Sequence, residues 1–372
     1  MIVMDIKIDN FFAFKNFHMN MSYPKKIVDS ALEYEYLFER PNFRYKKVNI
    51  LMGANATGKT SIGKMLMLIF NFIDKKHFER LTEKICIEEN DASFTVDFVV
   101  QKYKLYRVDV RIASKLEEKY KVSDISLDIR SVNITKKDSY ESCSKKIEAM
   151  PVNKKNSYIE ELEEIEGLSW LFEYPSDYQL RDKVHIAKKS IRYVRILEYT
   201  LRALDPAIIK VEKITEVEDT YVIRMANRSV VMQEGKIIDN NILSSGTKAG
   251  LEIAAILDSI LEGGHKFYYC DEKFSYAHSD IEKAFLAVMI QCLKVDDQLF
   301  FTTHNTDILD MPLPKHSFTF LKKDSNDNTQ PIKCVNASEF LKRNTDSLRC
   351  AVDNDLFSVA PGVELIYEIA DL

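Results

Sequence analysis

A glycine-bracketed loop constrains the fold of this 372-residue chain more than any other feature. The segment KKVNILM, residues 46–52, is a short apolar run ending at a glycine, which is typical of a buried parallel strand. The loop GANATGKT, residues 53–60, matches the pattern GxxxxGK[ST] at every fixed position. Apolar residues from Ile62 to Ile73 then recur at helical spacing. Strand, loop and helix in this order predict a phosphate-binding loop.

Each part of the loop has a role in this prediction. Glycines let successive backbone N–H groups face inward around phosphates, and the helix that begins near Lys59 adds the positive end of its dipole. We expect Lys59 to reach the β- and γ-phosphates of ATP, and the Thr60 hydroxyl to ligate Mg²⁺. The alternative is a plain glycine turn. The predicted nucleotide-binding residues are Gly53, Ala54, Asn55, Ala56, Thr57, Gly58, Lys59, Thr60 and Ser61.

Polar residues that follow two later apolar runs are candidates for the catalytic groups. The run FYYC, residues 267–270, leads into Asp271 and Glu272, at the carboxyl end of a predicted strand, where sites in α/β sheets assemble. We expect Asp271 to hold Mg²⁺ and Glu272 to polarise the attacking water. The run QLFFTT, residues 298–303, leads to His304, which would sense the γ-phosphate. A surface acidic turn and a structural histidine are the alternative interpretations.

The segment LSSGT, residues 243–247, precedes another apolar-periodic helix. Small polar residues at a helix start favour anion binding, so we expect Ser244, Ser245 and Gly246 to contact nucleotide. The alternative is N-capping by serine, which stabilises a helix by about 1 kcal/mol and needs no ligand.

The remaining pattern predicts an α/β protein in three segments. Residues 1–113 contain the phosphate loop and further strands, and in residues 207–372 strands and helices alternate, which indicates a parallel sheet with helical crossovers. Residues 114–206 are rich in Lys and Glu and predict an inserted, mainly helical subdomain.

The composition excludes several classes of protein. A net charge of −5 gives no global attraction to nucleic acid or membranes. Six scattered cysteines without a CxxC pair indicate reduced thiols. The N-terminus lacks the features of a signal peptide, and the longest apolar runs are far shorter than the roughly 20 residues of a bilayer span. We therefore expect a cytoplasmic protein with no membrane contact.

Together these segments resemble the ABC-type ATPases, and among them the SMC/RecF/OLD-like branch, over about residues 1–110 and 205–372. LSSGT is similar to the family signature LSGGQ, with two positions substituted. In DEKFSYAHSD, Ser275 and His278 match the D-loop of OLD-like ATPases, while Ala277 and Ser279 depart from it. The resemblance implies a P-loop NTPase fold with an ABC-type head and an Mg²⁺-dependent ATPase activity. Gln101 is the nearest candidate for the family's Q-loop.

The resemblance also implies partners. In this family the signature of one subunit closes over ATP held by another, so we expect at least a homodimer, with Ser244 and Gly246 acting in trans. OLD-like ATPases without a nuclease of their own occur in bacterial anti-phage systems such as PARIS and Septu. The first functional hypothesis is therefore a sensor or regulator of a separate nuclease or toxin effector, responding to a phage-encoded trigger, with residues 114–206 as the partner-binding surface.

Two other roles stay open. A RecF/SMC-like DNA-binding ATPase in repair would need a basic track, for which KKSIRYVR, residues 188–195, is the local candidate. A transporter subunit is disfavoured by the altered signature. A loose nuclease pattern, Asp109 with Glu117-x-Lys119, is common in charged chains and carries little weight.

Overall fold

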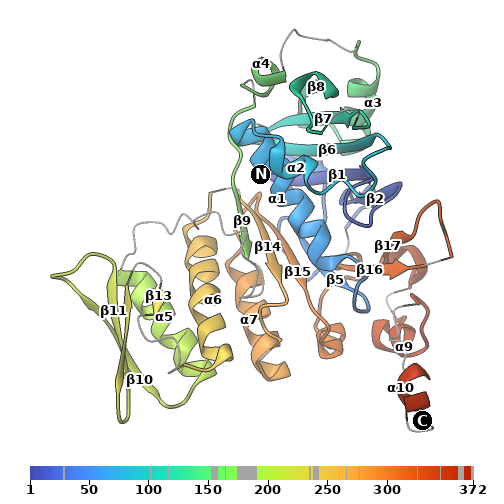
Figure 1. Cartoon of the computed structure of the whole chain (residues 1–372). Helices are drawn as coiled ribbons and strands as arrows, with labels where there is room; N and C mark the ends of the chain where they lie inside the picture. Colours follow the sequence, from blue (N-terminus) through green and yellow to red (C-terminus); the bar gives the residue numbers. More distant parts are fainter. Residues whose placement is uncertain are drawn as a thin grey trace. The chain divides into compact units, whose positions relative to one another are not determined.

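The computed structural model describes the chain in ranges separated by gaps, and these residues divide into two compact units. Unit 1 comprises Met1–Trp170, His265–Tyr269 and Val295–Leu372, and unit 2 comprises Leu171–Gly264 and Cys270–Lys294 (Figure 1). The described ranges are 1–27, 30–100, 103–115, 118–151, 158–163, 165–173, 191–233, 236–237, 243–264, 266–275, 277–324, 326–343, 345–358 and 364–369.

An antiparallel sheet of order β2-β1-β6-β7-β8 forms one layer of unit 1. The alternation of apolar and polar residues over 93–112 predicts two antiparallel strands, and this is confirmed because β6 and β7 pair along their whole length. The strands are β1 (Ile2–Asp9), β2 (Phe17–Asn20), β6 (Ala92–Val100), β7 (Lys104–Ile112) and β8 (Ile125–Asn133). A small hairpin of β3 (Tyr36–Leu37) and β4 (Arg40–Arg44), and the helices α2 (Glu79–Thr82), α3 (Tyr140–Glu148) and α4 (Tyr158–Glu163), complete this part.

A second sheet, of order β17-β16-β5-β15-β14-β9, carries the predicted phosphate loop. Strand β5 is parallel to both β15 and β16, as the sequence predicts. Every residue of β5, β14 and β15 is buried, which explains their continuous apolar runs. The strands are β5 (Val48–Met52), β9 (Trp170–Glu173), β14 (Phe267–Asp271), β15 (Gln298–Thr302), β16 (Phe318–Lys323) and β17 (Ile332–Asn336). Short helices α8 (Ala337–Phe340), α9 (Leu348–Asp353) and α10 (Glu364–Glu368) follow.

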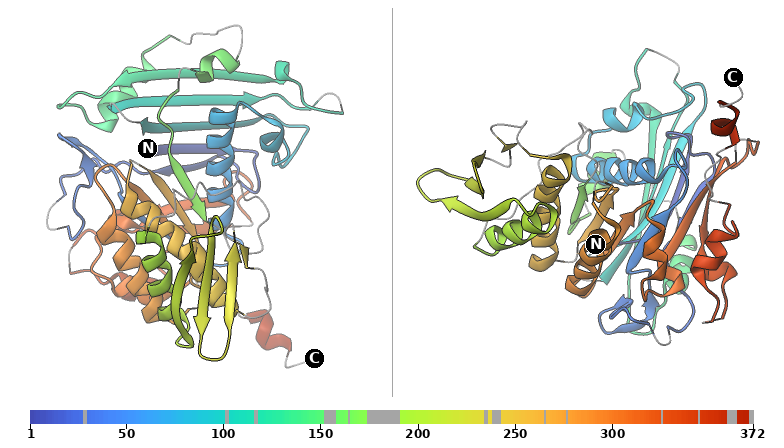
Figure 2. Two further views of the ribbon diagram at one scale, coloured as in Figure 1. Left: turned by 90° about the vertical axis from the view of Figure 1, so that its left-hand side faces the viewer. Right: turned by 90° about the horizontal axis from the view of Figure 1, so that it is seen from below.

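Helix α1 (Lys59–Lys75) packs between these two sheets (Figure 2). Its Phe70 ring lies 6.4 Å from Phe98 of β6 and 5.8 Å from Phe267 of β14, measured between ring centroids. Because both sides of the helix are covered, apolar residues occur nearly all round it. The loop that precedes α1 is therefore attached to a helix that packs against a sheet on each of two sides.

Unit 2 contains an antiparallel sheet of order β10-β11-β12-β13 with helices α5 and α6 packed together. The segments AIIKVEKI, TYVIRMA and SVVMQEG predict three strands. They are confirmed as β10 (Ile208–Ile214), β11 (Thr220–Met225) and β12 (Ser229–Gln233), and β13 (Lys236–Ile237) adds a short fourth. The helices are α5 (Ile191–Leu204), α6 (Ser245–Glu262) and α7 (Ser279–Cys292). The Tyr193 ring of α5 lies 5.8 Å from Tyr221 of β11, inside the core of this unit.

The predicted insertion, residues 114–206, is not a single mainly helical body. Strand β8 pairs with β7 from Ile125 to Asn133, and the segment is divided between the units after Trp170. The Lys- and Glu-rich composition of the segment conceals this strand, although Ile125, Leu127 and Ile129 alternate with Ser126, Asp128 and Arg130 along β8. Helices α3 and α4 pack on the strand, and Asp128 is only 9% exposed.

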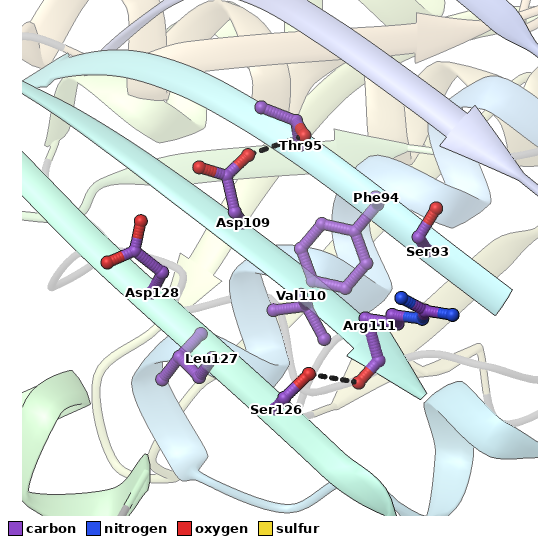
Figure 3. Close-up of a pocket in the computed structure, with 9 residues that line it drawn as sticks. All are labelled: Ser93, Phe94, Thr95, Asp109, Val110, Arg111, Ser126, Leu127 and Asp128. Carbon is purple, nitrogen blue, oxygen red and sulfur yellow. Dashed lines mark hydrogen bonds between the residues drawn. The ribbon is translucent and has the colours of Figure 1, made fainter. Parts of the chain in front are cut away.

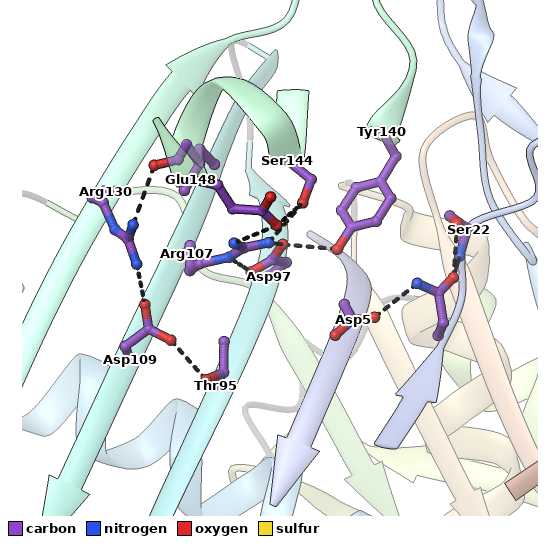
Figure 4. Close-up of polar contacts among 12 residues, drawn as sticks. Asp5, Ser22, Thr95, Asp97, Arg107, Asp109, Arg130, Tyr140, Ser144 and Glu148 are labelled. Carbon is purple, nitrogen blue, oxygen red and sulfur yellow. Dashed lines mark hydrogen bonds and ion pairs between the residues drawn. The ribbon is translucent and has the colours of Figure 1, made fainter. Parts of the chain in front are cut away.

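A buried ion pair in this sheet is hydrogen-bonded to residues of α3 (Figure 4). Asp97 of β6 is fully buried and accepts two hydrogen bonds from the guanidinium of Arg107 on β7, at 2.7 and 2.6 Å. Tyr140 of α3 donates its hydroxyl to the same carboxylate at 2.8 Å, and Ser144 accepts from Arg107 at 2.9 Å. Such pairs are stable only when both charges have hydrogen-bond partners.

Among the residues that the structure describes, no helix is long and apolar enough to span a bilayer.

Candidate nucleotide-binding site

The predicted phosphate loop begins directly at the end of β5. All five residues of β5 are buried, and the loop then leads into α1 at Lys59. Asn55 and Ala56 at the tip of the loop are exposed, whereas Thr57 is buried and donates its hydroxyl to the carbonyl oxygen of Ala54 at 2.8 Å. The loop is thus a closed turn with its own internal hydrogen bond, set at the carboxyl end of a parallel strand.

Two positions in the loop require glycine. A Cβ atom at Gly53 would lie 2.5 Å from the carbonyl oxygen of Leu321, a distance at which backbone atoms would have to move. Gly58 has φ = 101°, in the left-handed region that residues with a side chain rarely adopt. The fixed glycines of the sequence pattern therefore correspond to physical constraints on this loop.

Lys59 folds back over the loop. Its side chain is only 4% exposed, and its Nζ donates to the carbonyl oxygens of Gly53 at 2.8 Å and Ala54 at 3.3 Å. The first turn of α1 lies wholly within the described residues and contains no acidic side chain. An ammonium group beside a helix N-terminus concentrates positive potential on the loop, and this suits an anion.

Tyr269 of β14 supports the loop, although no sequence motif selects it. Its hydroxyl donates to the backbone carbonyl of Lys59 at 2.6 Å. On the same helix, a Cβ atom at Gly63 would lie 2.4 Å from the Tyr269 ring. A glycine inside an otherwise apolar helix was the one available signal, since such glycines often mark a close approach.

His304 lies at the same edge of the sheet as the loop. Strands β5 and β15 are parallel and pair Leu51 with Thr302. Gly53 and His304 each follow two residues later, so both emerge at the carboxyl ends of neighbouring strands. The His304 side chain is exposed, and Asn305 then begins a 3₁₀ turn by accepting from the Asp307 N–H at 3.0 Å.

The acidic pair Asp271–Glu272 ends β14, where the sequence placed it. Asp271 is fully buried, and Glu272 is partly buried with φ = 46°, a left-handed conformation that is uncommon for a residue with a side chain. The Ser275 hydroxyl donates to the Glu272 carbonyl at 2.7 Å and stabilises the turn. Backbone strain of this kind concentrates at functional positions.

Within unit 2, the alternative interpretation of the signature segment is observed. The Ser244 hydroxyl accepts from the Thr247 N–H at 3.1 Å and so caps α6. Thr247 is buried, and its hydroxyl lies 3.3 Å from an Asp205 carboxylate oxygen that can accept from it. Ser244 itself is exposed, and Gly246 is partly buried. Contact of Ser244 and Gly246 with a nucleotide stays a prediction.

The structure gives no support to the loose nuclease pattern or to the Q-loop candidate. Asp109 lies in a pocket of about 300 Å³ on the outer face of β6, β7 and β8 (Figure 3). Its carboxylate accepts from the Thr95 hydroxyl at 2.6 Å and from Arg130 at 2.7 Å, which is a structural role within the sheet. Gln101 and Glu117 lie outside the described residues.

The chain has a mixed α/β fold in which a glycine loop joins a buried parallel strand to a helix, the arrangement of an ABC-type P-loop head. The chain is similar to the solved structure of an SMC head bound to the C-terminal winged-helix domain of ScpA, with a TM-score of 0.52 and 12% identity over 92% of this chain and 100% of that chain. It is also similar to an SMC head domain with an extended coiled coil bound to the C-terminal domain of ScpA, derived from Pyrococcus furiosus. There the TM-score is 0.50 and the identity 12%, over 92% and 98% of the two chains. At this identity the likeness concerns the fold. No protein-family model and no curated protein matches the sequence.

Proposed function

We propose that this protein is an Mg²⁺-dependent ATPase that binds ATP at Gly53–Ser61. The observation that carries the proposal is the position of Lys59, buried over a glycine loop at a helix N-terminus without acidic neighbours in its first turn. An ammonium group and inward-facing N–H groups suit a polyphosphate. Mg²⁺ usually keeps several waters and needs only one or two protein ligands, a role that Thr60 and Asp271 would fill. When bound, Mg²⁺ would neutralise charge that develops on the phosphates.

The remaining groups would act on the nucleotide from different elements. Glu272 accepts a proton from the attacking water and orients it. His304 reports the presence of the γ-phosphate from the neighbouring strand. Ser244 and Gly246 approach the ATP of a second copy, so the working form is a homodimer with composite sites. The exposed position of Ser244 at the start of α6 supports this arrangement.

Lys59→Ala is the direct test. We expect ATP turnover to fall about 10²- to 10³-fold, because one preorganised cationic donor to the phosphates is lost. The measurement is phosphate release under saturating ATP and Mg²⁺. Lys75→Ala, a change of the same kind at the exposed far end of α1, is the control and should retain full activity. Equal turnover by Lys59→Ala and the wild type would refute the assignment of the loop.

We further propose that the ATPase regulates a separate nuclease or toxin effector in bacterial anti-phage defence. Its support is the similarity of the segment after Glu272 to the D-loop of OLD-like ATPases. The two matching residues hold definite positions: the Ser275 hydroxyl bonds the Glu272 carbonyl at 2.7 Å, and the His278 side chain caps α7 by accepting from the Asp280 N–H at 3.3 Å. A turn of this kind would report the state of the catalytic glutamate to a partner.

One observation favours the second candidate function, a RecF/SMC-like ATPase that binds DNA. The outer face of α5 presents Arg195 beside Tyr199, which is 58% exposed, and an arginine with an aromatic ring can contact phosphate and stack on a base. The charge of this face is partly neutralised, because Arg192 pairs with Asp258 at 2.7 Å and Arg202 pairs with Glu198 at 3.5 Å.

One pair of assays separates the two candidates. In the defence role, cells that carry the gene with its neighbours should resist phage, and Lys59→Ala should abolish that resistance. In the DNA role, the purified protein should bind duplex DNA with an affinity that falls steeply between 50 and 200 mM salt, and Arg195→Ala should weaken this binding. Resistance without DNA binding supports the effector hypothesis, and the reverse result overturns it.

A further inference from the structure

Lys273, the residue after Glu272, is buried within unit 2. Its side chain is 1% exposed, although a lysine ammonium is costly to remove from water unless it is paired. Neither the predicted loop nor the acidic pair explains this lysine. The sequence pattern around Asp271 and Glu272 has no requirement for a cation at position 273.

Carboxylates from two different elements lie beside the Lys273 ammonium group. Its Nζ contacts Glu252 of α6 directly and lies 3.8 Å from Glu173 of β9. The side chains of both acids are largely buried, at 14% and 5% exposed. A lysine between two acids in a low-dielectric setting is strongly held. Lys273 therefore joins three elements of unit 2.

The partner on α6 connects this cluster to the signature segment. Glu252 lies seven residues after Ser245, the first residue of α6, which is about two helical turns. The helix between them is stiff, because α6 is regular from Ser245 to Glu262. A displacement or rotation of the α6 N-terminus would thus reach Glu252 and, through the ion pair, Lys273.

The backbone of Glu272 is the element that this movement would reach. Glu272 has φ = 46° and is held in that conformation by the bond from the Ser275 hydroxyl on one side and by buried Lys273 on the other. A shift of the Lys273 backbone would turn the peptide bond that it shares with Glu272, and with it the direction of the Glu272 side chain.

We propose that Lys273 is a positioning residue that couples the signature helix α6 to the orientation of Glu272. The inference rests on the proposed ATPase function. Contact of Ser244 with nucleotide on a second copy would set the position of α6, and the Glu252–Lys273 pair would align the general base accordingly. Hydrolysis then depends on assembly of the dimer through an ionic link within each copy.

The test compares Lys273→Met, the double variant Lys273→Met/Glu252→Gln and the control Lys283→Met. Lys283 is a partly exposed lysine on α7 that pairs with Asp280, so its substitution removes a lysine of unit 2 that is not one of the three residues of the cluster. Lys273→Met leaves two buried acids facing each other and is expected to lower the melting temperature. The double variant restores the charge balance and should recover that temperature.

The kinetic constants kcat and KM distinguish a positioning role of Lys273 from a purely structural one. In both Lys273 variants we expect kcat to fall about 10- to 100-fold, with the KM for ATP nearly unchanged, because only the geometry of the reacting groups is disturbed. Lys283→Met should match the wild type. The inference is overturned if the double variant regains kcat together with its melting temperature, or if folded Lys273→Met has wild-type kcat. A wild-type protein without ATPase activity would instead refute the proposed function.

Discussion

Glu272→Gln is expected to slow ATP hydrolysis about 10²- to 10⁴-fold, the usual contribution of a general base. Glutamine has nearly the shape of glutamate but does not accept a proton from water at neutral pH. Binding of ATP should persist, since the phosphate loop is unaltered. The variant should therefore accumulate as an ATP-bound dimer, which single-turnover kinetics and light scattering in the presence of ATP and Mg²⁺ would detect.

Glu262→Gln provides the matched control. Glu262 is an exposed residue at the C-terminal end of α6, and the same change there should leave turnover and oligomeric state unaltered. A Glu272→Gln variant that hydrolyses ATP normally would remove Glu272 from the site. One that binds ATP as a monomer would contradict the composite-site proposal while leaving the phosphate loop intact.

Arg107→Ala is expected to lower the free energy of unfolding by about 3–5 kcal/mol, the cost of leaving one partner of a buried ion pair without the other. The Arg107 side chain is 11% exposed, and it donates twice to the fully buried Asp97 carboxylate. Its removal leaves that carboxylate with the Tyr140 hydroxyl and without a cation. Urea denaturation followed by circular dichroism measures the difference.

The same strand supplies the control for this prediction. Arg111, four residues further along β7, pairs with Asp91, but its side chain is 69% exposed. Arg111→Ala should cost less than about 1 kcal/mol, because exposed pairs are screened by water and salt. Equal destabilisation by the two substitutions would show that the buried position of the Asp97 pair has no special energetic role.

Much of the fold was predictable where the local pattern has a single physical meaning. The run before Gly53, the loop and the helix after Lys59 each appear at the expected residues, since a buried strand, a glycine turn and an apolar helix leave distinct patterns. The acidic pair and His304 were likewise placed at strand ends, because strand termini follow directly from the apolar runs.

The features that sequence reasoning missed depend on contacts between distant segments. Strand β8 was hidden because its short alternating run, Ile125 to Arg130, lies in a segment whose Lys and Glu content favours helices, and because it is held by pairing with β7. The support that Tyr269 gives to Lys59 links residues 210 positions apart, and no local pattern encodes such a bond. The burial of Lys273 could not be predicted either, because its two partners, Glu173 and Glu252, are distant from it in the sequence.

The contact of Gly63 with Tyr269 has a consequence for how such sequences can diverge. A methyl group at position 63 would lie 2.4 Å from the Tyr269 ring, so residues 63 and 269 cannot be substituted independently of each other. A lineage that acquires alanine at 63 would be viable only after a smaller residue replaces Tyr269, and that replacement forfeits the bond to the Lys59 carbonyl. Related chains should therefore exchange these two residues as a pair or retain both.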